Sequence, residues 1–253
     1  RILSAAAVLA LSASLLVGCS SGTASSVPVS ASSAAESTVS SVEETASSAV
    51  DENEAAAAQL LNDLTGSYQE LWPVILADEY KQTWLDVCTA LVGEDNAEAA
   101  FEKLSSMVTG DVYGEDAVKA YANGGGAYFC GFTNSLAILT FDGETSTISG
   151  TDKDGNVLFS HTYHYIGMEP VRGLYEFQSD DADSGEFTYF FLAPDTSAET
   201  YHIEFRYGSD AEALSQYDTG EYAYWLASGI STDCDQTMID NCIELFCTEN
   251  LAG

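Results

Sequence analysis

The sequence predicts an α+β domain that is mainly β, in which helices flank an antiparallel barrel or sandwich. Three observations support this fold class. Apolar residues recur at helical spacing before the glycines at 124–126, short strand-type runs separated by turns follow them, and helical spacing returns over 236–247. Short strands in sequential hairpins are typical of an antiparallel barrel or sandwich.

The elements follow from local periodicity. Leu76, Tyr80, Trp84, Cys88 and Leu91 recur at about the spacing of one helix face, which predicts a helix there. Further helices are predicted over 54–64, 101–108 and 236–247. Strands are predicted over 128–132, 136–141, 146–149, 157–166, 174–177, 187–192 and 201–207, with turns between them at residues such as Asp142-Gly143.

The composition is strongly acidic. The 253 residues include 7 Lys+Arg and 40 Asp+Glu, which gives a formal net charge of −33. Such a charge repels nucleic acid and anionic lipid headgroups, so we expect neither as a partner. It attracts cations and keeps the chain soluble, but charge alone does not identify a metal site.

The N-terminal residues predict export and lipid attachment. An apolar run over 2–17 has the length of an export-signal core and ends in Leu16-Val17-Gly18-Cys19, which resembles the lipobox of bacterial lipoproteins. The thiol of Cys19 would carry the lipid, and this anchor would be the protein's membrane contact. We therefore expect residues 1–19 to be a lipoprotein signal peptide, and the protein to be extracytoplasmic and anchored to the bacterial cell membrane.

The composition predicts that residues 20–50 form a disordered tether and that residues 51–253 form a folded domain. The tether is rich in Ser and Ala, contains no aromatic residue and shows no helix or strand periodicity. Such a segment buries too little apolar surface to offset the entropy of ordering.

Five cysteines remain in the folded domain, namely Cys88, Cys130, Cys234, Cys242 and Cys247. Disulfides form outside the cytoplasm, so one or two bridges with at least one free thiol are expected. The spacing contains no C-x-x-C pair, which disfavours a zinc ribbon, and it does not define the connectivity.

Several stretches resemble the ZinT (YodA) family of extracytoplasmic zinc-binding proteins. Gly66–Pro73 is similar to the family's G-x-W-Q-S-x-Y-P, Tyr163–Gly167 to Y-x-Y-x-G, and Val171–Glu176 to V-R-Y-L-F-E. Ala193-Pro194 followed by Glu199–Asp210 resembles A-P … E-H-F-H-F-R-Y-G-S-D. These blocks occur in family order.

The resemblance implies a calycin-type β-barrel, similar in shape to lipocalins, with one zinc ion held at its mouth by three histidines. One histidine lies upstream of the A-P pair, and two form an H-x-H on the next strand, where residues i and i+2 share a face. In this chain the upstream position falls at Phe190, the first of the pair at Thr200 and the second at His202. Phe190 is not a ligand and Thr200 is a poor one, so only His202 retains the expected imidazole.

Three interpretations follow from this partial match. The metal site is rebuilt, with Glu204 on the face of His202 and with His161 or His164 approaching across the barrel. Alternatively, metal binding is lost, and the barrel binds a small organic ligand or presents a surface to a protein partner. Residues Phe190, Tyr163 and Tyr165 are the expected lining of an organic-ligand pocket.

Catalytic motifs are missing from the sequence. It contains no G-x-S-x-G, H-E-x-x-H, P-loop or dinucleotide-binding pattern, so we expect a binding protein and not an enzyme. The leading hypothesis is a lipid-anchored barrel that binds zinc or a similar divalent ion and assists a metal-import system.

Overall fold

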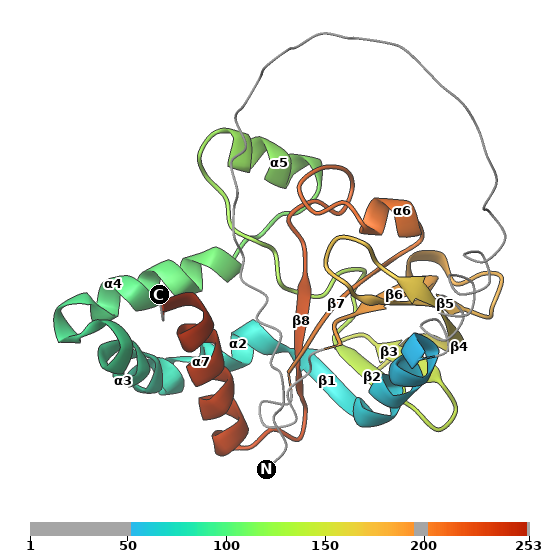
Figure 1. Ribbon diagram of the computed structural model, residues 1–253, viewed down its shortest axis with the longest axis horizontal. Helices are drawn as coiled ribbons and strands as arrows, with labels where there is room; N and C mark the ends of the chain where they lie inside the picture. The colour runs from blue at the N-terminus through green and yellow to red at the C-terminus, as the bar shows by residue number, and fades with distance from the viewer. Residues whose placement is uncertain (1–51, 195–201, 252–253) are drawn as a thin grey trace, which may run out of the picture. The chain divides into compact units, whose positions relative to one another are not determined.

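The computed structural model describes residues 52–194 and 202–251, and its eight strands form one closed antiparallel barrel (Figure 1). Each strand pairs with the next along the chain, and β8 pairs with β1 to close the barrel. The predicted mainly β, α+β fold with flanking helices is therefore confirmed, as a barrel and not a sandwich. The strands are β1 (Gly66–Glu70), β2 (Ile138–Asp142), β3 (Thr147–Thr151), β4 (Val157–Met168), β5 (Tyr175–Ser179), β6 (Tyr189–Leu192), β7 (His202–Gly208) and β8 (Ala227–Ser231).

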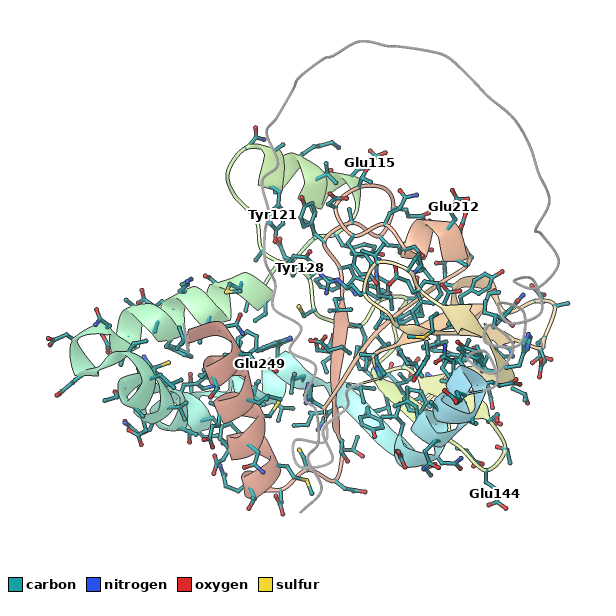
Figure 2. The ribbon with its side chains drawn as sticks, viewed as in Figure 1. Glu115, Tyr121, Tyr128, Glu144, Glu212 and Glu249 are labelled. Carbon is teal, nitrogen blue, oxygen red and sulfur yellow. The ribbon has the colours of Figure 1, made fainter. Side chains whose placement is uncertain are left out.

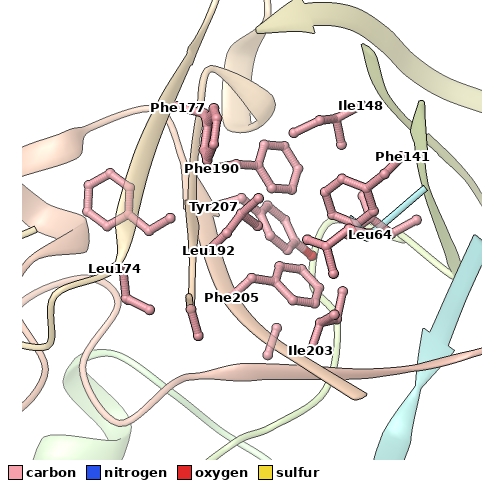
Figure 3. Packing of buried hydrophobic residues seen from close by; sticks show 14 of the residues in the cluster. Leu64, Phe141, Ile148, Leu174, Phe177, Phe190, Leu192, Ile203, Phe205 and Tyr207 are labelled. Atoms are coloured by element: carbon pink, nitrogen blue, oxygen red, sulfur yellow. The ribbon is translucent and has the colours of Figure 1, made fainter. Parts of the chain in front are cut away.

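The barrel interior is filled by aromatic and aliphatic side chains (Figure 3). The ring of Phe190 packs against those of Tyr207 and Phe205, with centroids 5.3 and 6.4 Å apart. It also meets Tyr163 edge-on at 5.5 Å and Phe159 at 5.8 Å. An eight-stranded barrel has an interior about wide enough for side chains to fill, and here they fill it around Phe190.

Helices flank the barrel at several points. Residues 52–63 form a helix whose apolar residues, including Leu60 and Leu61, join the barrel core. The other helices are α2 (Leu71–Ile75), α3 (Lys81–Val92), α4 (Glu94–Val108), α5 (Glu115–Ala122), α6 (Ala211–Leu214) and α7 (Gln236–Leu251). Short 3-10 turns lie at Asp78–Tyr80 and Gly185–Phe187.

A second core lies outside the barrel, between α2, α3, α4, α7 and the outer face of β8. Its buried residues include Trp84, Leu104, Ile243 and Ile230, the last of which belongs to β8. The Trp84 indole Nε1 donates to the Ile75 carbonyl at 2.7 Å, so this large polar ring is satisfied inside the layer. The helical layer is thereby attached to the barrel through β8.

One predicted strand is wrong. Residues 128–132 form no named strand; Phe129 makes only isolated bridges, to Thr109 and Trp225. The Phe132 amide donates to Glu70 Oε1 at 2.6 Å instead of to a strand neighbour, and a Cβ at Gly131 would meet that same carboxylate oxygen at 2.7 Å. The backbone of Phe129 and Cys130 still bonds to the chain at Tyr224, Leu226 and Ser228, but the Glu70 side chain takes the Phe132 amide, so no regular ladder forms through the whole segment.

The predicted signal peptide (1–19), Cys19, the tether (20–50) and Thr200 lie outside the described residues. The described chain belongs to one compact unit, Ala49–Gly253. Within residues 52–194 and 202–251, the helices are too short or too polar to cross a membrane.

Candidate functional site

Strand β7 presents two different faces. Ile203, Phe205 and Tyr207 are buried in the barrel core, so the alternation of a strand directs His202 and Glu204 outward. His202 lies opposite Ile230, and Glu204 opposite Ser228, on β8. His202 is half-buried and Glu204 is exposed. The structure thus places the imidazole and the carboxylate that the sequence predicts as metal ligands on the same face of β7.

Phe190 lies on the other side of the sheet. It pairs with Tyr207 in the β6–β7 ladder and shares its inward face, where it is 0% exposed. The family's upstream ligand position therefore points into the core, whereas His202 points away from it. No side chain at position 190 shares a metal ion with His202 in this arrangement, because the sheet itself separates the two faces.

His161 and His164 do not approach His202 across the barrel. They lie on β4, and β5 and β6 stand between β4 and β7. Each imidazole is held locally: His161 Nδ1 bonds Asp181 Oδ2 and His164 Nδ1 bonds Asp180 Oδ1, both at 2.6 Å. The rebuilt site that would use either histidine is not formed.

Two buried thiols lie near the outer face of β7, and the sequence reasoning did not assign them to it. Burial raises the pKa of Cys130 to about 12, with the negative charge of Glu204 as the next cause. The same two causes, in the same order, raise the pKa of Cys242 to about 12. The Cys130 carbonyl accepts from the Ser228 amide at 3.0 Å, which fixes its chain segment beside β8. Both thiols are therefore within electrostatic reach of Glu204.

These groups do not yet form a complete metal centre. In the part of the chain that the structure describes, no three His, Cys, Asp or Glu side chains are arranged to hold a metal ion. The outer face of β7 offers an imidazole and a carboxylate, and binding of an ion there requires a third ligand to move into range. The sequence could not indicate that these thiols lie near His202, because Cys130 and Cys242 are distant from it along the chain and only the tertiary fold brings them near β7.

The acidic residues are spread over the molecule. Figure 2 shows Glu115 on α5, Glu212 on α6 and Glu144 in the turn between β2 and β3, three separate regions. Negative charge at such separate positions attracts cations generally and does not by itself mark one site.

Two grooves lie outside the barrel interior. One, of about 350 Å³, is lined by Glu70, Trp72, Phe129 and Cys130 among others, and a second, of about 470 Å³, lies beside β2 and the turn after β3. The expected organic-ligand lining does not form around Phe190 and Tyr163, because these rings pack on each other and the Tyr163 hydroxyl donates to the Phe187 carbonyl.

The fold defines a closed, filled antiparallel barrel with a helical layer on its outside. No family model and no curated protein matches the chain. Among solved structures it is similar to the Zn(II)-bound ZinT-like domain of Streptococcus pneumoniae AdcA, at 15% identity and a TM-score of 0.46, over 73% of this chain and 89% of that one. It is also similar to Zn(II)-bound AdcA from Streptococcus pneumoniae, at 14% identity and a TM-score of 0.44, over 74% of this chain and 35% of that one. Likeness at this level carries no assignment of site residues.

Proposed function

We propose that the protein is a lipid-anchored, extracytoplasmic barrel that binds a divalent metal ion, zinc in the first instance, on the outer face of β7 and assists its import. The observation that carries the proposal is that His202 and Glu204 project from the same face of one strand. Residues i and i+2 of a strand are close enough for both side chains to share one ion.

The chemistry of the neighbouring groups favours zinc. Imidazole nitrogen, carboxylate oxygen and thiolate sulfur are the ligands that zinc takes in proteins, in tetrahedral sets. Cys130 and Cys242 are the thiols whose pKa Glu204 influences, so they are the third and fourth ligands that the proposal names. Magnesium and calcium prefer sets made up of oxygen ligands, whereas the set proposed here includes an imidazole nitrogen and thiolate sulfurs.

The state of the thiols gives zinc binding a proton dependence. Both thiols have a pKa raised to about 12, so they are protonated at neutral pH while no metal is bound. Only the thiolate is a ligand, so each thiol that binds zinc releases a proton. Without metal, burial disfavours the charged thiolate and keeps each thiol protonated. The positive charge of a bound zinc ion offsets this cost and stabilises the thiolate.

The lipobox-like Leu16–Cys19 and the Ser/Ala-rich residues 20–50 that follow it support the proposed location. A lipid on Cys19 would hold the barrel at the outer side of the membrane, where it meets metal ions before an importer does. The net charge of −33 raises the cation concentration around it without selecting among cations. The function proposed is binding and delivery, with no catalytic step.

The test is metal stoichiometry. The unit Ala49–Gly253 is loaded with zinc, dialysed against buffer and analysed for bound metal by mass spectrometry. We expect about one zinc per chain, falling several-fold in His202→Ala and in Glu204→Gln. His164→Ala is the matched control, because it removes an exposed imidazole that lies on β4, away from β7, and that bonds the Asp180 carboxylate. Substoichiometric zinc in the parent protein, or equal loss in all three variants, would overturn the proposal.

A second candidate function is the binding of a small organic ligand in the 350 Å³ groove. The observation in its favour is that the buried aromatic ring of Trp72 and the carboxylate of Glu70 line the same groove. Native mass spectrometry of the protein isolated from its own cells tests it. A bound organic mass that is lost in Trp72→Phe supports this candidate, and an unliganded parent protein rejects it.

A further inference from the structure

Two fully buried thiols touch across the helical layer. Cys88 lies on α3 and Cys247 on α7, both are 0% exposed, and their Sγ atoms are 4.0 Å apart. The two helices run beside each other in the layer (Figure 1). Among the five cysteines of the described residues, all of them thiols here, this is the pair whose sulfurs are in contact.

The surroundings hold this pair in register. Trp84 of α3 and Phe246 of α7 pack edge to face, with ring centroids 6.0 Å apart. Trp84 lies one turn before Cys88, and Phe246 immediately precedes Cys247. Trp84 also packs on Phe101 of α4 at 5.6 Å. A sulfur–sulfur bond is about 2.05 Å long, so the two Sγ atoms must approach by about 2 Å for the bond to form.

We propose that Cys88 and Cys247 form a disulfide when the protein folds outside the cytoplasm. The new bond joins the two Sγ atoms, and the oxidant is a small-molecule or protein disulfide. One cysteine thiolate attacks a sulfur of the oxidant, which breaks the oxidant's S–S bond, releases its first thiolate and gives a mixed disulfide. The second cysteine thiolate then attacks the protein sulfur of that mixed disulfide and releases the oxidant's other thiolate. The two cysteines lose two electrons and two protons, and the oxidant leaves as two thiols.

The bridge divides the cysteines by role. It consumes Cys88 and Cys247 and leaves Cys130, Cys234 and Cys242 reduced. Two of these remaining thiols are the ones that lie within reach of Glu204. The cross-link spans 159 positions of sequence and fixes α7, which carries Cys242, to α3.

The burial of the pair dictates when the bond forms. Burial raises the pKa of Cys88 and that of Cys247, which keeps both sulfurs protonated and slow to react once the layer has closed. An oxidant also has no route to side chains that are 0% exposed. Oxidation therefore belongs to the folding step, and a protein folded first under reducing conditions stays reduced for longer.

Peptide mapping tests the bond. The full chain is produced by export in a bacterial host, isolated without reductant, alkylated, and digested with a protease that cleaves after Glu. The glutamates place Cys88 in fragment 80–94 and Cys247 in fragment 245–249, while Cys130 lies in 116–144 and Cys234 and Cys242 share 222–244. We expect fragments 80–94 and 245–249 to be joined and to separate on reduction. Alkylation of both cysteines in the exported protein, or linkage of either one to another fragment, would overturn the proposal.

Thermal unfolding supplies an independent readout. Reduction of the parent protein is expected to lower its Tm by at least about 5 °C, because a cross-link over a long loop restricts the unfolded chain. The double variant Cys88→Ala/Cys247→Ala should unfold at or below the Tm of the reduced parent, because it also loses two buried sulfurs, and its Tm should not respond to reductant. Cys234→Ser, a change of a partly exposed thiol outside the pair, should keep the parent's response. A reductant response that persists in the double variant would also refute the pairing. Zinc stoichiometry is measured on the same samples, so a failure of the disulfide and a failure of metal binding are told apart.

Discussion

Truncation of Phe190 tests whether the barrel is a packed core at the position where the family resemblance expects a ligand. The ring is 0% exposed and lies among Phe159, Tyr163, Phe205 and Tyr207, at centroid distances of 5.3 to 6.4 Å. Phe190→Ala removes all of these contacts and leaves a void whose walls are rings held by their own strands. Buried Phe→Ala changes of this kind destabilise by about 3–5 kcal/mol.

The assay is urea unfolding followed by tryptophan fluorescence, with the Tm measured alongside. A loss of about 3–5 kcal/mol corresponds to a fall in Tm of roughly 6–20 °C for a unit of this size. Phe190→Leu is the matched control, since it keeps most of the apolar volume and should lose about 1–2 kcal/mol. Zinc stoichiometry of the folded Phe190→Ala protein should equal that of the parent, because His202 faces the other side of the sheet.

Two results would refute this reasoning. A loss under about 1 kcal/mol in Phe190→Ala would mean that the interior is not packed around this ring, since a filled core does not tolerate such a void. Loss of zinc from folded Phe190→Ala would mean that position 190 does communicate with the metal site. Either result would return the barrel interior to consideration as the ligand-binding region.

The remaining predictions concern protons and buried polar groups. Zinc affinity should rise about tenfold per pH unit for each thiol that binds, because burial raises the pKa of Cys130 and that of Cys242 to about 12 and each thiol must lose its proton. Competition with a zinc indicator at pH 6 and at pH 8 measures this affinity, and an affinity that does not change with pH would contradict thiol ligands. Arg206→Lys should lower the free energy of unfolding by about 3 kcal/mol or more in urea, because the guanidinium is fully buried and donates to the backbone carbonyls of Leu214, Gln216 and Tyr222. A single ammonium cannot reach all three carbonyls, and a variant as stable as the parent would contradict this. Tyr207→Phe should lower the free energy of unfolding by about 1–3 kcal/mol in the same assay, because the hydroxyl accepts from the Thr133 amide at 2.6 Å and donates to the Thr133 carbonyl at 2.9 Å. An unchanged unfolding midpoint would show that water replaces both bonds.

Strands with an alternating pattern or a bulky apolar run, such as β4 and β6, were predictable from the sequence, whereas β1 and β8 were not predicted. β4, found at Val157–Met168, lies where the sequence places a strand over 157–166, because its residues alternate between core and solvent. β8 (Ala227–Ser231) was missed because it is covered by the barrel core on one side and by the helical layer on the other. Its small residues fit this position: a Cβ at Gly229 would meet the Ile203 side chain at 3.0 Å. Such a strand has neither alternation nor a bulky apolar run.

The local part of the candidate site was predictable, and the tertiary part was not. Strand alternation alone places His202 and Glu204 on one face, and the structure agrees. The direction of Phe190 depends on the β6–β7 register, which no local pattern specifies. The contact between Cys88 and Cys247 depends on how two helices pack 159 positions apart in the chain. The sequence reasoning left the disulfide connectivity open for the same reason.

The filled interior is the reason why the proposed metal site lies on the outside of the barrel. Where rings such as Phe190 and Tyr207 occupy the lumen, a ligand enters only by displacing them, at the free-energy cost of a large core truncation. On the outer face of β7, His202 is half-buried and Glu204 is exposed, so an ion reaches them without displacing the barrel core. The same face borders the helical layer, where Ile230 of β8 packs in the same cluster as Cys242 of α7. An ion bound there by His202 and a thiol of the layer would join the two cores of the molecule. The covalent link between α3 and α7 then acts on metal affinity as well as on stability, because it restrains the helix that carries one of the ligands.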